Sequence, residues 1–262
     1  MELRAGTRAL ITGASSGIGR ALATALAQRG ATLGLAARSA DELEALAHEL
    51  PGEHHAIECD VADSASVAAA IARFVATTGG LDLLIANAGI AHYANFKDQP
   101  LEDKLRMSQV NWHGTLHTVH FGLPHMRQGH IVIVASGAAL RSFPQAAVYG
   151  ATKAAQRALG EALRHELNDT GVSLTVVYPG EIATALHDHE KDRLPPWYRA
   201  GARAADPNAL AKRILEAVES DERAAYYPPI VRLLGIVHGL SPRAGDALLR
   251  RLRDESAAPR RG

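Results

Sequence analysis

The sequence lacks several features that define other classes of protein. Cys59 is the one cysteine in 262 residues, so no disulfide can form within the chain, which fits a reducing cytoplasm. The formal net charge at pH 7 is zero, so no broad electrostatic field draws nucleic acid. No apolar run approaches the ~20 residues that a transmembrane helix needs, and no leader sequence opens the chain. These absences predict a cytoplasmic protein with no nucleic-acid partner and no transmembrane segment.

What the sequence does contain is an alternation of apolar strands and helices. Hydrophobic residues make up 47% of the chain and charged residues 21%, which suits one domain with a sizeable core. The alternation predicts an α/β fold, a Rossmann-type doubly wound parallel sheet of about seven strands with helices on both faces. The predicted strands cover residues 8–12, 31–37, 54–58, 82–86, 130–135, 173–178 and 224–228. The predicted helices cover residues 17–29, 40–50, 63–77, 100–126, 147–169 and 206–219.

Tyr149 and Lys153 are the most informative pair of residues in the chain. A spacing of four on a helix places a phenol and an ammonium on one face, one turn apart. A neighbouring cation favours the phenolate, which eases proton exchange near neutral pH. Ser136 ends the apolar run 131–134, where its hydroxyl can hold the oxygen of a carbonyl or alcohol. The three residues predict a proton-transfer site, although a tyrosine and a lysine four apart also occur on ordinary solvated helices.

A glycine-rich loop follows the first predicted strand. Residues 12–19 read Thr-Gly-Ala-Ser-Ser-Gly-Ile-Gly and lead directly into an alanine-rich helix. Glycines allow a tight turn and a close approach of the backbone, and a helix N-terminus favours negative charge. The order of strand, glycine loop and helix therefore predicts a cradle for a pyrophosphate. The spacing of the glycines differs from the general dinucleotide fingerprint, and a plain turn is the alternative.

The end of the second predicted strand bears on the choice of cofactor. NAD-binding proteins place an acidic residue about 20 residues beyond the loop to hold the ribose 2′-hydroxyl. Ala37 occupies that place here, and Arg38 follows it. A guanidinium can pair with a 2′-phosphate through two hydrogen bonds. The sequence thus favours NADP(H) over NAD(H), unless Arg38 is simply an exposed charge before the next helix.

A further apolar strand ends in Asn87-Ala88-Gly89, whose small residues would let a cofactor lie across the strand ends. With this segment the chain resembles the short-chain dehydrogenase/reductase family, in its ordinary-length branch. The departures are Ala86 and Ala135, at positions where the family tolerates small residues. The matching motifs stand in family order and spacing: Thr12-Gly13, Gly17-Ile18-Gly19, Asp60-Val61, Asn87-Ala88-Gly89, Asn111, Ser136, Tyr149, Lys153, Pro179-Gly180 and Thr184.

The resemblance implies a role for each matching residue. Tyr149 would give or take the proton, Lys153 would lower its pKa and hold the nicotinamide ribose, and Ser136 would orient the substrate oxygen. Asn111 would hold a water that links Lys153 to solvent. The resemblance also implies a homodimer or homotetramer. The implied cofactor-binding residues are Gly13, Ser15, Ser16, Gly17, Ile18, Gly19, Arg38, Asp60, Val61, Asn87, Ala88, Gly89, Tyr149, Lys153, Pro179, Gly180, Ile182 and Thr184.

Two segments are less well explained by the resemblance. Within a dinucleotide-binding and catalytic domain of residues 1–228, residues 185–205 contain a proline-rich, aromatic stretch and are predicted to form a substrate lid. Residues 229–262 form a helical tail of the same domain, with a basic helix from Arg243 to Arg253. The tail could lie on a membrane surface, on a partner subunit or across the substrate opening. Together with the lid aromatics, it suggests a lipophilic substrate.

Two classes of function remain. The first is an NADP(H)-dependent oxidoreductase, a ketoreductase in the direction that NADP preference favours, which moves a hydride between nicotinamide and a carbonyl or secondary alcohol. The second is a non-catalytic NADP(H)-binding sensor or scaffold. Since a scaffold does not need Asn111, Ser136, Tyr149 and Lys153 together, their presence favours the enzyme. No metal site is predicted, because the three histidines at helical spacing, at 113, 117 and 120, have no accompanying carboxylate.

Overall fold

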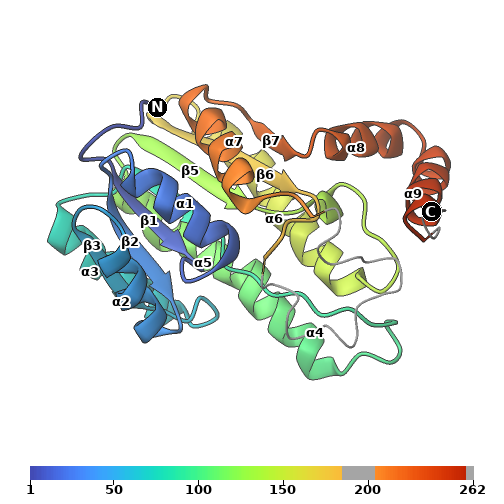
Figure 1. The fold of residues 1–262 in the computed structure, drawn as a ribbon, viewed down its shortest axis with the longest axis horizontal. Helices are drawn as coiled ribbons and strands as arrows, with labels where there is room; N and C mark the ends of the chain where they lie inside the picture. Colours follow the sequence, from blue (N-terminus) through green and yellow to red (C-terminus); the bar gives the residue numbers. More distant parts are fainter. Residues whose placement is uncertain (185–203, 258–262) are drawn as a thin grey trace, which may run out of the picture.

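In the computed structural model, which describes residues 1–184 and 204–257, seven strands form one parallel sheet (Figure 1). Their order is β3-β2-β1-β4-β5-β6-β7, so the sheet is wound outward in both directions from β1 and β4. The predicted fold class is confirmed, and every predicted strand lies within one residue of its observed bounds. The strands are β1 Arg8–Thr12, β2 Thr32–Ala37, β3 His54–Glu58, β4 Leu83–Ala86, β5 Gly129–Val134, β6 Val172–Pro179 and β7 Ala224–Tyr227.

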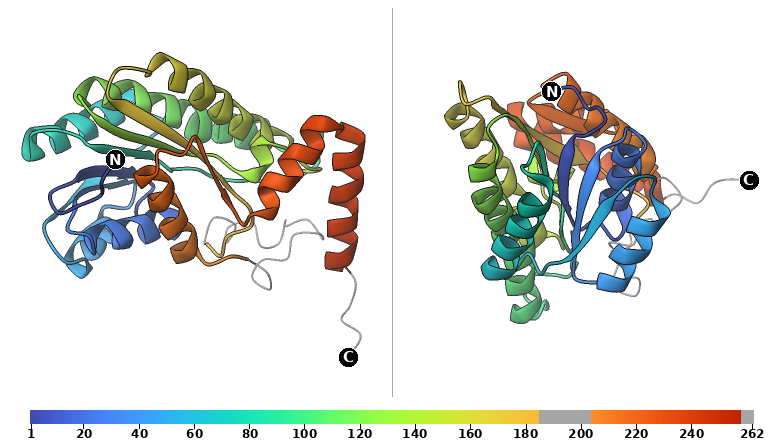
Figure 2. Two further views of the ribbon diagram at one scale, coloured as in Figure 1. Left: turned by 90° about the horizontal axis from the view of Figure 1, so that it is seen from above. Right: turned by 90° about the vertical axis from the view of Figure 1, so that its left-hand side faces the viewer.

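Helices cover both faces of the sheet, as the right-hand view of Figure 2 shows. Successive side chains of a strand point to opposite faces: on β1, Ile11 packs in the core on one side and Leu10 in the core on the other. Because both faces are covered, the strands read as continuous apolar runs. The first face carries α1 Gly17–Ala27, α2 Ala40–Glu49 and α7 Pro207–Glu219, and the second carries α3 Ser64–Thr78, α5 Gly114–Gly122 and α6 Ala147–Glu166.

The long helix predicted at residues 100–126 is interrupted in the structure. Helix α4, Leu101–Met107, passes into a π-helical turn, Ser108–His113, before α5 begins, and a short 3₁₀ turn, Leu123–His125, follows α5. A π-helical turn interrupts the regular hydrogen-bond pattern of an α-helix and is frequent at functional sites. Asn111 lies in this turn and is fully buried. The hydrogen bonds of Asn111 with other segments stabilise the π-helical turn. The spacing of apolar residues in the sequence therefore could not predict it.

Helix α6 ends at Glu166, three residues before its predicted end. The hydroxyl of Thr170 donates a hydrogen bond to the backbone oxygen of Leu167 at 2.8 Å, and Asp169 has φ 67°. These residues close the helix before Gly171. With φ 83°, Gly171 turns the chain into β6.

The C-terminal helices stand away from the sheet at one end of the molecule (Figures 1 and 2). They are α8 Ile230–Leu240 and α9 Pro242–Ala257, so the predicted basic helix lies within α9. Helix α8 is apolar on two sides: Val231 is buried against the body, whereas Ile230, Leu233, Ile236 and Leu240 are exposed. Residues 185–203 of the predicted lid lie outside the described residues. Ile182, which precedes the predicted lid, and Ala205, at the end of the predicted lid, form a parallel bridge.

Candidate active site

The ends of β1 and β4 meet the start of α1 in a cradle built on glycine. Gly13 has φ 68°, and a Cβ there would lie 2.9 Å from the Cα of Ala88. Gly17 has φ 54° at the start of α1, and a Cβ there would lie 3.1 Å from the side chain of Thr184. Side chains are therefore excluded at both positions. What remains is a backbone surface at a helix N-terminus, which suits a phosphate group.

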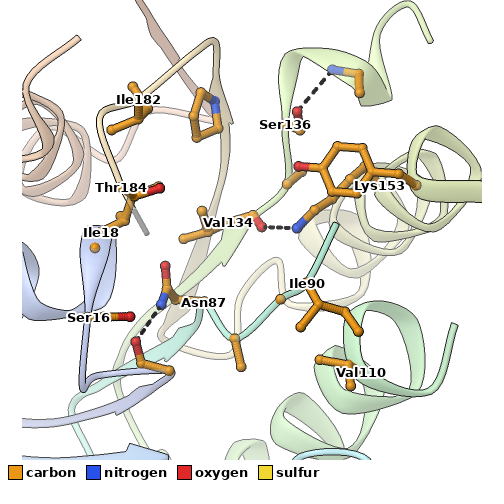
Figure 3. Close-up of a pocket in the computed structure, with 18 of the residues that line it drawn as sticks. Ser16, Ile18, Asn87, Ile90, Val110, Val134, Ser136, Lys153, Ile182 and Thr184 are labelled. Atoms are coloured by element: carbon orange, nitrogen blue, oxygen red, sulfur yellow. Dashed lines mark hydrogen bonds between the residues drawn. The ribbon is translucent and has the colours of Figure 1, made fainter. Parts of the chain in front are cut away.

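One cavity of about 790 Å³ runs along the carboxyl ends of the strands, and Figure 3 shows residues that surround it. Its position at the carboxyl edge of an open parallel sheet is where such folds bind ligands. The structure thus brings together residues that are spread over more than 170 positions of the sequence. The predicted residues that line it are Gly13, Ser15, Ser16, Gly17, Ile18, Arg38, Asp60, Val61, Asn87, Ala88, Gly89, Ser136, Tyr149, Lys153, Pro179, Gly180, Ile182 and Thr184.

Gly19 and Asn111 are the predicted site residues that do not line this cavity. Gly19 is buried in the first turn of α1, and a Cβ there would lie 2.1 Å from the backbone oxygen of Gly13. Its lack of a side chain therefore permits close packing of the helix on the loop. Sequence spacing cannot separate a glycine that faces the ligand from one that faces the loop, because both occur in the same motif.

Asn111 lies directly behind the cavity wall. Its Oδ1 accepts a hydrogen bond from the backbone N–H of Ile90 at 2.8 Å, and its Nδ2 donates to the oxygen of the same residue at 2.9 Å. Nδ2 also lies 3.1 Å from the hydroxyl oxygen of Thr152 on α6. Asn111 thus joins the π-helical turn to the segment after β4 and to the helix that carries Tyr149 and Lys153.

The side chains of Ser136 and Tyr149 lie close to each other at the cavity wall. Ser136 begins a 3₁₀ turn, Gly137–Ala139, and its Oγ accepts a hydrogen bond from the backbone N–H of Ala138 at 3.1 Å. Tyr149 is buried in the first turn of α6. Burial raises the pKa of the Tyr149 phenol, and the neighbouring hydroxyl of Ser136 opposes that effect. The phenol is therefore held in its protonated form near neutral pH.

Lys153 lies one turn further along α6, with its ammonium on the same side as the phenol. Its Nζ donates to the backbone oxygen of Val134 at 3.0 Å and lies 5.8 Å from the ring centre of Tyr149. Burial lowers the pKa of Lys153 to about 7. Burial dominates the phenol, so the net shift of the Tyr149 pKa is upward. The expected lowering of this pKa by Lys153 stays a prediction.

The other end of the cavity is polar and carries two arginines. Asp60 accepts a hydrogen bond from the backbone N–H of Ala62 at 3.0 Å and forms an ion pair with Arg106 of α4 at 3.0 Å. Burial raises the pKa of Asp60, but these contacts and the charge of Arg38 outweigh it, so the net pKa is lowered. Arg38 is exposed at the cavity edge after β2. The ion pair of Asp60 could not be found from the sequence, because Arg106 lies 46 positions away.

Helix α8 of the C-terminal tail forms part of the cavity wall. Val231 and Leu234 line the cavity. A Cβ on Gly137, or on Gly180, would lie 3.2 Å from a methyl group of Val231, so these two glycines admit α8 next to Ser136. A tail across the substrate opening was one of the three alternatives drawn from the sequence, but the residues that make these contacts were not predicted. Other lining residues that sequence reasoning missed are His92, Tyr93, Arg106, Arg141, Phe143 and Glu181.

The histidines at helical spacing make other contacts. The Nδ1 of His117 is hydrogen-bonded to the backbone oxygen of Val61 at 3.0 Å, and the ring of His113 stacks against that of His117. Within residues 1–184 and 204–257, no three metal-ligating side chains come together as a site.

Comparison with known proteins places this geometry in a family. Residues 7–194 match the family model described as short chain dehydrogenase. The chain is 33% identical over 214 residues to an uncharacterized oxidoreductase of Staphylococcus aureus, covering 80% of this chain and 90% of that one. It is also 34% identical over 229 residues to glycine betaine reductase ATRR of Emericella nidulans, covering 84% of this chain but only 18% of that longer protein.

Solved structures agree. A short-chain dehydrogenase/reductase from Burkholderia phymatum in complex with NAD superposes with a TM-score of 0.84 at 26% identity, covering 93% of this chain and 96% of that one. An alcohol dehydrogenase from Thermococcus sibiricus with 5-hydroxy-NADP gives a TM-score of 0.73 at 29% identity, covering 84% and 94%. The fold thus matches that of solved short-chain dehydrogenases/reductases, and this chain belongs to the short-chain dehydrogenase/reductase family.

Proposed function

We propose that this protein is an NADP(H)-dependent oxidoreductase that interconverts a carbonyl group and a secondary alcohol. The observation that carries the proposal is the placement of Ser136, Tyr149 and Lys153 together at one wall of the cavity that also contains the glycine cradle. The cradle fits the phosphates of a nicotinamide dinucleotide, because Gly13 and Gly17 carry no side chain. Backbone N–H groups at the start of α1 can therefore approach a bound phosphate. The cofactor would supply or accept the hydride.

Tyr149 is the proposed acid in the direction of reduction. Its pKa is raised by burial, so the phenol is protonated and able to donate to a carbonyl oxygen that gains negative charge. Ser136 would hold the same oxygen through its hydroxyl and so fix the direction of proton transfer. In the direction of oxidation, the same phenol oxygen would take the proton from the alcohol.

Lys153 and Asn111 have supporting roles in the proposal. The ammonium of Lys153 would hold the nicotinamide ribose, and its charge would stabilise the phenolate that forms as the proton leaves Tyr149. Asn111 is placed beside the same wall, since a Cβ on Gly89 would lie 3.2 Å from its Oδ1 and 3.5 Å from the Nζ of Lys153. We assign to Asn111 a proton relay from Lys153 to solvent.

The preference for NADP(H) rests on Arg38. Ala37 and Arg38 line the cavity at the end of β2, where an NAD-binding site would place a carboxylate. The family resemblance does not decide between the cofactors, because the structural neighbours include both an NAD complex and a 5-hydroxy-NADP complex. An exposed guanidinium at this position favours the 2′-phosphate.

The Tyr149→Phe variant tests the proposal. It should bind NADPH with unchanged affinity, measured by nicotinamide fluorescence, and reduce ketones at least ~100-fold more slowly than the wild type. A panel of ketones graded from small and polar to long-chain would supply the substrates. If the wild type binds NADPH but reduces none of them, the protein is better described as an NADP(H)-binding sensor or scaffold. Unchanged turnover in the variant would exclude the proposed acid.

We propose a lipophilic substrate because apolar side chains line part of the cavity. Val231, Leu234, Phe143 and Tyr93 line the cavity around Tyr149, and apolar walls favour apolar ligands. The exposed apolar residues of α8 and the basic residues of α9 also suit a peripheral contact with a membrane. Among the residues the structure describes, no helix is long and apolar enough to span a bilayer.

A homodimer or homotetramer formed through α6 is part of the proposal. The outer side of α6 exposes a row of alanines, at positions 147, 151, 154, 158 and 162. Small side chains at this spacing let two helices approach closely. We also propose a cytoplasmic location and one domain in two parts, a catalytic part over residues 1–228, with the lid at about 185–205, and a tail over residues 229–262.

A further inference from the structure

Glu181 is a cavity-lining carboxylate that the proposed reaction does not use. It follows β6 directly, beside Gly180, at the carboxyl edge of the sheet. Its backbone oxygen accepts a hydrogen bond from the N–H of Ala205 at 2.9 Å, so the main chain of the residue is fixed. Its Oε1 is buried and has no hydrogen-bond partner in the described part of the chain.

Most other charged side chains that line the cavity are paired. Asp60 is bound by Arg106, and Arg141 is bound by Asp246 of α9. Lys153 donates to a backbone oxygen. Asp60 and Glu181 are the two carboxylates in the described lining, so Glu181 is the one that lacks a cation. The protein leaves a negative group at the cavity wall without a partner of its own, and a buried polar atom of this kind is costly unless something else satisfies it.

The surroundings of Glu181 define what could satisfy it. Ile182 is buried next to it, and Val231 of α8 packs over Gly180. Phe143 and Tyr93 line the same cavity on the side of Tyr149. Apolar walls beside a carboxylate suit an alkylammonium group, whose methyl or methylene groups contact the walls while its charge faces the carboxylate. Burial alone raises the pKa of Glu181, which a bound cation would reverse.

We infer that Glu181 recognises a cationic nitrogen on the substrate, so that the preferred substrates are amino ketones or amino alcohols with an apolar body. The inference rests on the proposed function, because the nitrogen must lie in the cavity in which Ser136 and Tyr149 hold the oxygen. It adds a specificity-determining residue to that function. Arg38 would then bind the phosphate of the cofactor, and Glu181 would bind the ammonium of the substrate.

A matched pair of ligands tests the inference. One is a methyl ketone that ends in a dimethylammonium group, and the other is its isostere that ends in an isopropyl group. Both are titrated by calorimetry into the protein saturated with NADP⁺, where no hydride is available and binding is measured alone. The Glu181→Gln variant keeps the shape of the side chain and removes its charge. Glu53→Gln removes an exposed glutamate in the turn before β3, at the opposite edge of the sheet, and serves as the control.

The wild type and Glu53→Gln should bind the cationic ketone at least about tenfold more tightly than its isostere, and Glu181→Gln should lose that preference. Equal binding of the two ketones to the wild type, or no measurable binding of the cationic one, would overturn the inference. So would a preference that survives in Glu181→Gln. If the substitution weakens NADP⁺ binding while the preference is unchanged, Glu181 faces the cofactor and the inference is again wrong.

Failure of the proposed function gives a different result. The same ketones are then offered to the protein with NADPH. A wild type that reduces the isopropyl ketone but shows no cationic preference keeps the proposed reaction and loses the role of Glu181. A wild type that prefers the cationic ketone in the binding experiment, yet reduces neither, keeps the role of Glu181 and loses the proposed reaction.

Discussion

Arg141 and Asp246 form an ion pair that joins the loop after Ser136 to helix α9, 105 positions later in the chain. Arg141 lines the cavity, and its guanidinium also donates to the backbone oxygen of Ser142. The side chain of Arg141 is 17% exposed and that of Asp246 is 44% exposed. The C-terminal helices are therefore connected to the active-site wall by a charge pair as well as by the packing of Val231.

Replacing Asp246 with Asn should alter substrate binding more than chemistry. The variant keeps the size of the side chain but leaves Arg141 without its carboxylate. A partly exposed pair of this kind contributes about 1 kcal/mol, so the KM for a bulky ketone should rise roughly threefold to fivefold. The kcat for a small ketone should not change, because Ser136 and Tyr149 are not touched. Steady-state kinetics of Glu161→Gln, which breaks the exposed pair with Arg157, provide the control, and a parallel fall in kcat would contradict the prediction.

Replacing Arg38 with Ala should reduce the affinity for NADPH and leave that for NADH nearly unchanged. A hydrogen bond to a charged group contributes about 1.5–3 kcal/mol, so the dissociation constant for NADPH should rise roughly 10-fold to 100-fold. Fluorescence titrations of both cofactors would measure it. Arg73→Ala removes an exposed arginine of α3 and controls for the change in net charge. Equal effects on NADPH and NADH would mean that Arg38 does not read the 2′-phosphate.

The pKa of Lys153 predicts how ketone reduction varies with pH. Burial lowers this pKa to about 7, so the ammonium is present below that pH and is lost above it. Tyr149 stays protonated over the same range, because burial raises its pKa. The kcat/KM for reduction should therefore fall as pH rises through about 7. In Lys153→Arg, whose guanidinium keeps its charge, this fall should disappear, whatever the absolute rate. A fall at the same pH in the variant would assign it to another group.

The sequence was sufficient for the parts of the site that lie within one element. Tyr149 and Lys153 are one helical turn apart, and the glycine loop is continuous in the chain, so local spacing predicted both. The strands were also predictable, because their apolar runs are bounded by glycine and polar residues. Gly19 shows the limit of local spacing. Its motif was recognised, but the sequence could not tell that Gly19 packs against the loop instead of lining the cavity.

Contacts between distant segments were not predictable. The pairing of Arg141 with Asp246 and the packing of Val231 on Gly137 depend on how α8 and α9 fold back onto the sheet. The π-helical turn at Asn111 depends on the backbone of Ile90. Glu181 stands inside a recognised motif, but its unpaired oxygen becomes visible only when all of its neighbours are known. In each case the missing information is tertiary.

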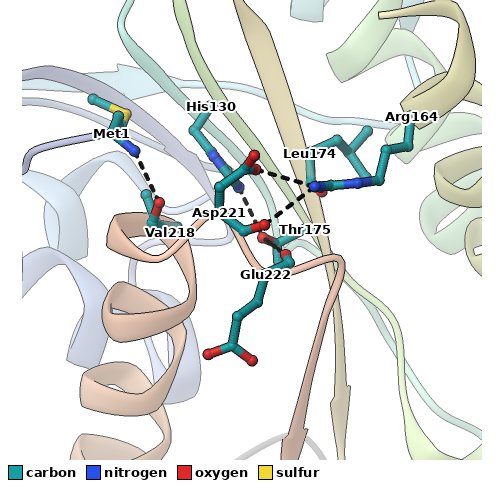
Figure 4. A network of polar contacts seen from close by, with 8 residues as sticks. All are labelled: Met1, His130, Arg164, Leu174, Thr175, Val218, Asp221 and Glu222. Carbon is teal, nitrogen blue, oxygen red and sulfur yellow. Dashed lines mark hydrogen bonds and ion pairs between the residues drawn. The ribbon is translucent and has the colours of Figure 1, made fainter. Parts of the chain in front are cut away.

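A second polar network joins β5, β6 and the turn before β7 (Figure 4). His130 of β5 is fully buried, and its Nε2 lies 2.8 Å from the hydroxyl oxygen of Thr175 on β6. That hydroxyl donates to the backbone oxygen of Glu222. Burial first, and then the charges of the amino terminus and Arg164, lower the pKa of His130 to about 4 against the opposing charge of Asp221. The folded protein therefore holds this imidazole neutral.

His130 should make the fold sensitive to mild acid. The unfolded chain protonates this histidine as pH falls below about 6.5, whereas the folded protein does so only near pH 4. Between these values the unfolded state binds more protons, so the free energy of unfolding falls as pH falls, by up to about 3 kcal/mol from this group. Urea denaturation at pH 7 and pH 4.5 would measure the loss. In His130→Gln the loss should be smaller than in the wild type, whereas in His48→Gln, which changes an exposed histidine of α2, it should be unchanged. An equal loss in all three proteins would assign the acid sensitivity to the carboxylates that have lowered pKa values, Asp60 and Asp82.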